Sequence, residues 1–385
     1  MKVLILVASP ITTDPRVYNE AQALIKDGHS VTVIAWDREK QNPAKQAWDG
    51  IDVLRLRIPL SPKYGLSVPP WHIFHLIAWQ CQAYQKAVTL NKENSFDVIH
   101  CHFLDTLPVG IMLKRKLGLP LIYDARDMYG YMMQASFPRC IARAFEWLEK
   151  CLIMRADRII AVNEVMAGCF TGMIGKPVTV VMNCKPLQDR EYQSRGNTDK
   201  FTLLCIGTLH KSRALPWLMN AVRDLSDVHC IIGGVGQSDY VEYIEKECNK
   251  IPNVAFVGRV PADMVLPMTG KADVVVSIFD PVNPNGKLAT PNKLFEAMVC
   301  GRPIICIRGT YCAEITEREA IGLAVEYSVE ALKKAIIKLR DDPQLRERMG
   351  RNALNAAITI YNWPIEEKKL VELYREIQVM AGRGD

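Results

Sequence analysis

Short apolar runs alternate with amphipathic segments along most of the chain. In the amphipathic segments, apolar residues recur at helical spacing, as at Val17, Ala21 and Leu24, and Gly28 stands where such a helix would end. Strand, helix and strand in repetition predict a parallel sheet that is covered by helices on both faces. The apolar runs that predict strands are 3–8, 31–36, 51–57, 97–102, 119–123, 158–162 and 178–182, followed by 201–206, 228–233, 253–257, 273–278 and 303–307.

The alternation is interrupted by the polar stretch 185–200, which has no period and is typical of an interdomain linker. We therefore expect an α/β protein with two doubly wound, Rossmann-like domains facing each other across a cleft, at residues 1–188 and 200–360. After a break at Pro364, a last amphipathic helix within 361–385 is expected to pack back on the first domain. Ligands of such sheets bind beyond the carboxyl ends of strands, so the loops after strands are the candidate sites.

The 385 residues have the composition of a globular protein, with 49% hydrophobic and 23% charged residues. The net charge of +6 is too small and too dispersed to indicate nucleic acid, although it suits an anionic ligand or a membrane surface. The cysteines show no C-x-x-C and no zinc spacing, which is typical of free thiols in a reducing cytosol. Residues 1–9 resemble a buried strand more than a signal peptide, and no run reaches the ~18 apolar residues of a membrane span. We expect a cytoplasmic protein, soluble or peripheral.

The segment 285–303, NGKLATPNKLFEAMVCGRP, carries the strongest signal for a ligand. Thr290 suits an N-cap and Pro291 a first helical position, so a helix is expected to begin here, after the strand at 273–278 and an irregular loop at 280–289. The amide groups of such a terminus bind anions, and Lys293 adds a full charge. Glu296 shares the face of Lys293. The amide groups and Lys293 could bind a pyrophosphate, and Glu296 could bind a ribose diol. The alternative is an ion pair between Lys293 and Glu296 on the protein surface.

Two further loops follow strands of the second half. Arg213 opens a helix directly after the strand at 201–206, where a guanidinium could hold phosphate or simply lie in a solvated basic turn. The glycine-rich stretch 233–236 lacks the full G-x-G-x-x-G, so a tight turn is favoured over a dinucleotide-binding loop.

In the first half, His100 and His102 alternate along one strand and share a face at its carboxyl end. They could act as acid, base or substrate contacts, or be structural. Asp14 and Arg16 open the first helix on the cleft side by topology, and Asp14 could cap that helix or contact an acceptor.

The loop after the strand at 119–123 adds two candidate residues, Arg126 and Asp127. Arg126 could neutralise a phosphate, brace Asp127 or take part in a buried ion pair.

The pattern P-N-K-L-F-E-A-M-x-x-G-x-P at 291–303 resembles the nucleotide-sugar signature of family 4 (group 1) glycosyltransferases, which have the GT-B fold. Segments similar to that family follow one another in the expected order over nearly the whole chain. They are DPRVYNEAQALIKDGHSVTV at 14–33, DVIHCH at 97–102, YDARD at 123–127, AVNEVM at 161–166, IGTLHKSRALPWL at 206–218 and NVAFVGRVP at 253–261.

The resemblance implies a retaining hexosyltransferase that moves a sugar from a UDP- or GDP-linked donor to a glycan or lipid-linked acceptor, in cell-envelope glycan biosynthesis. It implies no cofactor and no nucleic-acid partner. The chain has no D-x-D, the metal-binding carboxylate pair of the other major glycosyltransferase fold, so metal-independent transfer is expected.

The resemblance also assigns roles to the candidate residues. Three positions depart from the family pattern: Leu288 stands in place of a Glu that contacts the donor sugar, Thr208 in place of an Arg, and Arg126 where a His is frequent. The catalytic candidates are Lys293, Arg213, Arg126 and His102; the donor-binding candidates are Glu296, Thr208, Arg259, Thr290, Asn292 and Gly286; the acceptor-side candidates are Asp14, Arg16, His100 and Asp127.

The sequence is also compatible with two other functions. A nucleotide-sugar 2-epimerase has the same double-domain fold, and it would need a carboxylate placed for proton transfer at C2. A non-catalytic binding or scaffold protein is the second, because Leu288 and Thr208 replace functional residues of the family.

Aromatic, proline and basic residues gather within 60–88 and again near 129–137. Such residues suit a membrane interface, and they could equally pack helices on the sheet. We expect contact with the inner face of the cell membrane through Pro62, Lys63, Tyr64, Pro69, Pro70, Trp71, Phe74, Trp79 and Tyr84, together with Tyr129, Tyr131, Met132, Met133 and Phe137.

Overall fold

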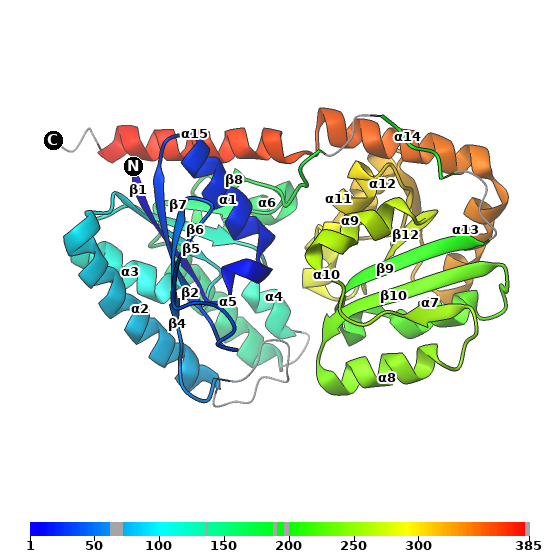
Figure 1. Cartoon of the computed structure of the whole chain (residues 1–385), viewed down its shortest axis with the longest axis horizontal. Coiled ribbons are helices and arrows are strands. Elements are labelled where there is room, and N and C mark those ends of the chain that lie inside the picture. Colours follow the sequence, from blue (N-terminus) through cyan, green and yellow to red (C-terminus); the bar gives the residue numbers. More distant parts are fainter. Residues whose placement is uncertain (62–71, 135–137, 188–190, 196–199, 382–385) are drawn as a thin grey trace. The chain divides into compact units, whose positions relative to one another are not determined.

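The computed structural model describes residues 1–61, 72–134, 138–187, 191–195 and 200–381 (Figure 1). The chain forms two compact units. Of the described residues, those up to Met182 and from Glu366 onward form the first unit, and those within Asn183–Ile365 form the second. Each unit has its own sheet covered by helices, so the predicted α/β class with two Rossmann-like domains is confirmed.

The sheet of the first unit has the order β3-β4-β2-β1-β5-β6-β7-β8. All neighbours are parallel except β3, which is antiparallel to β4. The connections change direction between β1 and β5, which is where a doubly wound sheet opens a site at its carboxyl edge. The strands are β1 (Lys2–Val7), β2 (Ser30–Trp36), β3 (Lys45–Trp48), β4 (Ile51–Leu56), β5 (Val98–His102), β6 (Leu121–Ala125), β7 (Arg158–Ala161) and β8 (Thr179–Val180).

The first helix of this unit begins where the sequence predicted. The side chain of Asp14 accepts the N–H of Val17 as an N-cap, Pro15 follows at the first helical position, and Gly28 has a left-handed φ of 84° just beyond the last turn. The helices are α1 (Pro15–Lys26), α2 (His72–Asn94), α3 (Leu107–Leu117), α4 (Tyr129–Gln134), α5 (Arg139–Ile153), α6 (Glu164–Ile174) and, from Glu366 onward, α15 (Trp363–Ala381).

The sheet of the second unit is parallel throughout, in the order β11-β10-β9-β12-β13-β14, and its connections change direction between β9 and β12. The strands are β9 (Phe201–Leu209), β10 (Val228–Gly236), β11 (Val254–Phe256), β12 (Val274–Ser277), β13 (Ile304–Ile307) and β14 (Gly322–Val325). The helices are α7 (Leu215–Val222), α8 (Ser238–Cys248), α9 (Ala262–Gly270), α10 (Pro284–Leu288), α11 (Asn292–Val299), α12 (Tyr311–Arg318), α13 (Val329–Asp341) and α14 (Pro343–Thr359).

The glycine-rich stretch 233–236 is strand rather than the predicted tight turn. β10 continues through it and pairs with β9, with Gly234 opposite Gly207. A Cβ on Gly234 would collide with the carbonyl oxygen of Gly207, so the glycines are needed because two backbones come close together. The short strands β3 and β14 were not predicted from the sequence, because their side chains are only half-buried or exposed.

Within the described residues, no helix combines the length and the apolar character that crossing a bilayer requires.

Candidate functional site

The strongest sequence motif forms a helix start beside the central strand of the second unit. α11 begins at Asn292 with Pro291 in the cap position, so Thr290 is not the N-cap that the sequence predicted. Lys293, in the first turn, extends along the carboxyl end of β9, and its Nζ lies 3.5 Å from Cys205 Sγ. A Cβ on Gly207 would lie 3.6 Å from Lys293 Cε, an ordinary contact distance, so the Lys293 side chain lies directly beside Gly207. The ammonium group therefore lies at the reversal point of the sheet, where an anion would bind.

Glu296, one turn further along α11, forms an ion pair that the sequence did not predict. Its Oε1 lies 3.3 Å from Lys185 Nζ, and the two side chains are 12% and 15% exposed. Among the described residues, no Lys293–Glu296 ion pair is found. Asn183 adds a second contact by donating from Nδ2 to Asn292 Oδ1 at 2.5 Å. Lys185 from the predicted linker and Asn183, two residues before it, thus contact the first turns of α11.

Arg213 ends a 3-10 turn (Lys211–Arg213) that follows β9 directly. Its guanidinium carbon lies 3.5 Å above the ring of Phe279, which comes just after β12. The backbone N–H of Asp280 donates to Ser212 O at 3.1 Å, so the loops after β9 and β12 are joined. The position of Arg213 is thereby fixed at the reversal point of the sheet.

The other donor-side candidates lie on the same edge of the second sheet. Thr208 is exposed near the end of β9, and Arg259 is exposed after β11. The predicted irregular loop contains the short helix α10, in which Gly286 lies, and Asn283 caps this helix by accepting the N–H groups of Asn285 and Gly286. Leu288, at the end of α10, is 8% exposed and part of the interior.

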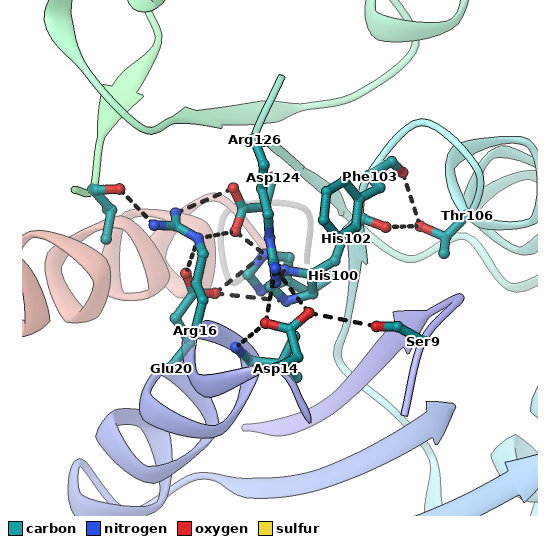
Figure 2. Close-up of polar contacts among 12 residues, drawn as sticks. Ser9, Asp14, Arg16, Glu20, His100, His102, Phe103, Thr106, Asp124 and Arg126 are labelled. Atoms are coloured by element: carbon teal, nitrogen blue, oxygen red, sulfur yellow. Dashed lines mark hydrogen bonds and ion pairs between the residues drawn. The ribbon is translucent and has the colours of Figure 1, made fainter. Parts of the chain in front are cut away.

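In the first unit, a network of buried charges lies where β1, β5 and β6 end (Figure 2). Arg16 on α1 is at its centre. Its Nε and Nη2 donate to the two oxygens of Asp124 at 2.7 and 3.1 Å, and its Nη1 donates to Val181 O at 2.8 Å. The side chain is 2% exposed, so Arg16 supports this edge of the sheet from inside.

Arg126 is the cation of this network nearest the surface. Its Nη1 lies 2.7 and 2.8 Å from the two carboxylate oxygens of Asp14, and its Nη2 lies 3.0 Å from His102 Nδ1. The guanidinium also lies 4.4 Å above the ring of Phe103, whose φ of 64° is left-handed. With 13% of Arg126 and 10% of Asp14 exposed, this pair is the part of the network that a ligand would meet. Asp127 follows, half-buried.

Glu20 and the two histidines fill the inner part of the network, and all three are fully buried. The rings of His100 and His102 stack with centroids 4.4 Å apart. Glu20 Oε2 lies 3.8 Å from His100 Nε2 and 3.6 Å from His102 Nε2. His100 Nδ1 lies 2.9 Å from the hydroxyl of Tyr374 on α15. Sequence reasoning missed Glu20 and Tyr374; the only local signal was the i, i+4 spacing of Arg16 and Glu20.

Burial and neighbouring charges shift the pKa values of the two inner carboxyl groups, Glu20 and Asp124, in opposite directions. Burial raises the pKa of Glu20 well above its usual value. Burial alone would also raise the pKa of Asp124. The guanidinium of Arg16 and the imidazole of His102 nevertheless lower this pKa well below the usual value of an aspartic acid. Burial lowers the pKa of His100 and of His102. Burial and the neighbouring charges therefore favour the ionised form of Asp124, the protonated form of Glu20 and the neutral forms of the two imidazoles.

Four residues of this network could in principle offer ligands to a metal ion: Glu20, His100, His102 and Asp124 have potential ligand atoms within 4.8 Å of one another. However, the imidazole planes of the two histidines differ by only 20° in a stacked pair, and a metal must lie in the plane of each imidazole that binds it. His102 also directs Nε2 toward Glu20 and Nδ1 toward Asp124, on opposite sides of its ring. This geometry does not suit a metal ion bound by both histidines.

Two family models match this chain. The model described as "Glycosyl transferase 4-like domain" matches residues 13–184. The model described as "Glycosyl transferases group 1" matches residues 200–342. Each model covers most of one of the two sheets.

Similar proteins cover nearly the whole chain. It is 24% identical over 395 residues to an uncharacterized glycosyltransferase of Methanocaldococcus jannaschii, with 94% of each chain covered. Sucrose-phosphate synthase from Thermosynechococcus elongatus is similar in structure, with TM-score 0.81, 17% identity, and 99% of this chain and 100% of that chain covered. Anabaena HepE in complex with UDP-glucose is also similar in structure, with TM-score 0.73 and 17% identity. The match covers 98% of this chain and 100% of that chain. At these identities, the structural matches show the fold alone.

Proposed function

The chain belongs to family 4 (group 1) of the glycosyltransferases, with the GT-B fold, and we propose that it moves a hexose from a UDP- or GDP-linked donor to a glycan or lipid-linked acceptor without a metal ion. It is a retaining glycosyltransferase that uses a nucleotide sugar. The proposal extends to the donor, the acceptor and the residues that act on each.

The observation that carries the proposal is the position of Lys293 and Arg213 at the reversal point of the second sheet. Lys293 lies beside β9 over Gly207, and Arg213 is held over Phe279 in the loop that follows the same strand. Two cations and the amide groups of a helix start can hold a diphosphate there. A uridine donor is the first to test, because the similar Anabaena protein was solved with UDP-glucose.

We assign the steps of transfer as follows. The bond between the anomeric carbon and the diphosphate oxygen breaks, and Lys293 and Arg213 stabilise the negative charge that develops on the diphosphate. The acceptor hydroxyl forms the new bond on the same face of the sugar, and its proton passes to the diphosphate, so no protein nucleophile is needed. Glu296 binds the ribose diol of the donor. The first unit presents the acceptor beside Asp14 and Arg126, with His102 behind them.

The test is incubation with a panel of nucleotide sugars and glycan or lipid-linked acceptors, with release of nucleotide diphosphate as the readout. Lys293→Met should lower kcat by roughly 10²–10³-fold, the effect of removing one group that stabilises transition-state charge. Lys287→Met is the matched control, since the side chain of Lys287 is exposed on α10 nearby. Equal activities of the two variants would remove Lys293 from the mechanism.

The same assay distinguishes the two other functions. A 2-epimerase would return the nucleotide sugar as a stereoisomer, or release a glycal. A scaffold protein would leave the nucleotide sugar unchanged.

Peripheral membrane contact is proposed for the first unit. At the start of α2, Ile73, Phe74 and Ile77 are 50%, 70% and 47% exposed. Trp79 is instead buried and stacks on Trp36 with ring centroids 5.9 Å apart, so for this residue packing on the sheet is the correct alternative. Of the other residues expected at the membrane, seven lie outside the described part of the chain: Pro62, Lys63, Tyr64, Pro69, Pro70, Trp71 and Phe137.

A second exposed apolar face supports this contact. On α5, Trp147 and Leu148 are 67% and 42% exposed, and the basic residues Arg143 and Lys150 are exposed on the same helix. Apolar residues beside basic ones are typical of an interface with anionic lipid. In a flotation experiment at low salt, the protein should rise with anionic liposomes. A smaller fraction of the Trp147→Ser or Phe74→Ser variant should do so. Protein that stays at the bottom of the gradient at low salt would favour a soluble acceptor.

A further inference from the structure

The carboxylate of Glu296 faces a lysine that lies far from α11 in the sequence. Glu296 Oε1 is 3.3 Å from Lys185 Nζ, and the two side chains are only 12% and 15% exposed, so the pair is largely removed from water. Lys293 shares the first turns of α11 with Glu296, but it extends along β9, where its Nζ lies 3.5 Å from Cys205 Sγ. Lys185 therefore brings a further cation to the helix start to which we assign the donor.

The backbone around Lys185 is anchored inside the second unit. The backbone O of Lys185 accepts the N–H of Trp363 at 3.1 Å. Cys184 is fully buried, and Asn183 donates from Nδ2 to Asn292 Oδ1 at 2.5 Å in the first turn of α11. Lys185 thus differs from a lysine on a free surface loop, because its backbone is already in place beside α11. A preformed site of this kind binds a ligand at a lower entropic cost.

The contact between Lys185 and Glu296 leaves most of their hydrogen-bonding capacity unused. At 3.3 Å it is longer than the roughly 2.7–2.9 Å of a hydrogen bond between an ammonium and a carboxylate. Within the part of the chain that the structure describes, neither charged group has a hydrogen-bond partner. Charges that are largely removed from water need such partners, because the ionic attraction alone does not offset their desolvation. Unused acceptors on Glu296 therefore lie beside unused donors on Lys185.

A pair of neighbouring hydroxyl groups matches this combination of donors and acceptors. Each hydroxyl donates one hydrogen bond and accepts others, whereas a carboxylate can only accept and an ammonium group can only donate. A carboxylate alone would bind the protons of a diol and leave its oxygens without donors. An ammonium group beside the carboxylate supplies those donors. The ribose of a nucleotide carries such a diol, and the sugar of a deoxyribonucleotide lacks one of the two hydroxyls.

We propose that Lys185 is a donor-binding residue, which together with Glu296 binds both hydroxyls of the ribose and selects ribonucleotide donors over deoxyribonucleotide donors. This rests on the proposed function, since it requires a nucleotide at the start of α11. A missing hydroxyl leaves one of two largely buried charges without a partner, and a site built to bind a hydroxyl rejects the analogue that lacks it. A deoxythymidine-linked sugar should therefore be a poor donor, although its diphosphate could meet Lys293 and Arg213 in the same way.

Calorimetry with UDP and with 2′,3′-dideoxy-UDP, which lacks the diol, tests this proposal. The unmodified protein should bind UDP about 100-fold more tightly than dideoxy-UDP, and this ratio should fall to about tenfold in Lys185→Met, where Glu296 alone remains. The affinity for dideoxy-UDP should change little. Because both nucleotides are measured on the same variant, a general loss of folded protein cancels in the ratio. Lys287→Met is the matched control, since Lys287 is exposed on α10, and it should keep the ratio of the unmodified protein.

The outcomes separate this proposal from the proposed function. An unchanged ratio in Lys185→Met would overturn the role of Lys185 and leave the proposed function intact. Tighter binding of UDP by Lys185→Met would also overturn it, because this is the result expected if Lys185 blocks Glu296. If the unmodified protein binds GDP instead of UDP, the same comparison is made with GDP and dideoxy-GDP. A protein that binds neither nucleotide would refute the proposed function, and this inference with it.

Discussion

One carboxylate, that of Asp14, both caps a helix and pairs with a cation, and two substitutions can separate these roles. Its Oδ1 accepts the N–H of Val17 at 3.4 Å, and both of its oxygens lie within 2.8 Å of Arg126 Nη1. Asp14→Asn keeps an oxygen for the cap but loses the charge. Asp14→Ala loses both. The difference in stability between the two variants measures the contribution of the helix cap. The loss of stability in Asp14→Asn alone measures the effect of removing the charge.

The expected magnitudes follow from burial. The cap bond is long, so its loss should cost about 0.5–1 kcal/mol, the lower part of the usual range. Loss of the charge leaves Arg126, which is 13% exposed, without its carboxylate. For a fully buried guanidinium, the loss of its carboxylate would cost about 3–5 kcal/mol of folding free energy. Because Arg126 is slightly exposed, we expect this cost to be about 2–3 kcal/mol. We therefore expect Asp14→Asn to cost about 2–3 kcal/mol and Asp14→Ala about 3–4 kcal/mol.

Urea unfolding followed by hydrogen exchange of peptides from α1 and β6 reports on the first unit separately from the second. Adding Arg126→Met to Asp14→Asn should recover about 1–2 kcal/mol, because no unpaired buried charge remains. Arg126 holds the pKa of Asp14 below its usual 3.8, so the stabilisation is present above that pH and is lost as the pH falls further. Additive costs for Asp14→Asn and Arg126→Met would refute the ion-pair reasoning. Equal costs for Asn and Ala would refute the cap.

Three further predictions concern donor binding, metal dependence and pH. Glu296→Ala should weaken nucleotide affinity by about 1.5–3 kcal/mol, the range for a hydrogen bond to a charged group, and unchanged affinity in calorimetry would place the ribose elsewhere. Transfer should continue in EDTA; complete loss that manganese or magnesium restores would contradict a metal-independent reaction. Glu149 accepts the N–H groups of Tyr129 and Gly130, and burial raises its pKa from 4.5 to about 7. In this pH range the folded state keeps a proton on Glu149 that the unfolded state releases. The stability should therefore fall by ~3 kcal/mol as the pH rises from about 4.5 to 7. In thermal melts, the Glu149→Gln variant should show a smaller dependence on pH.

The sequence was sufficient for the fold because the strands of a parallel sheet are buried on both faces. β1 reads VLILV after its first residue, and β12 reads VVVS, so each is visible as an apolar run. The edge strand β3, KQAW, has no buried residue and therefore gave no such signal. Loops after the central strands could be identified in advance for the same reason, which is how Lys293, Arg213 and Arg126 became candidates.

The partners within the site could not be predicted, because they depend on the order of the strands and on packing across long sequence separations. Glu20 meets His100 only because β5 lies beside β1, and Tyr374 meets it from the last helix. The ion pair of Glu296 with Lys185 was likewise missed, because the sequence places Lys185 in a polar stretch without any period. Residue type and spacing suggest which groups do chemistry, but they do not say which groups orient them.

The division of α15 between the two units has a consequence for synthesis on the ribosome. Among the described residues, the second unit lies within Asn183–Ile365, whereas the first needs the residues from Glu366 onward. Until these residues emerge, the N–H of Met182 lacks the carboxylate of Glu366, and His100 lacks the hydroxyl of Tyr374. Domains usually fold in the order in which they are translated. Here the unit that is begun first is completed last, so a chain that ends directly after Ile365 should contain the whole second unit and an incomplete first one.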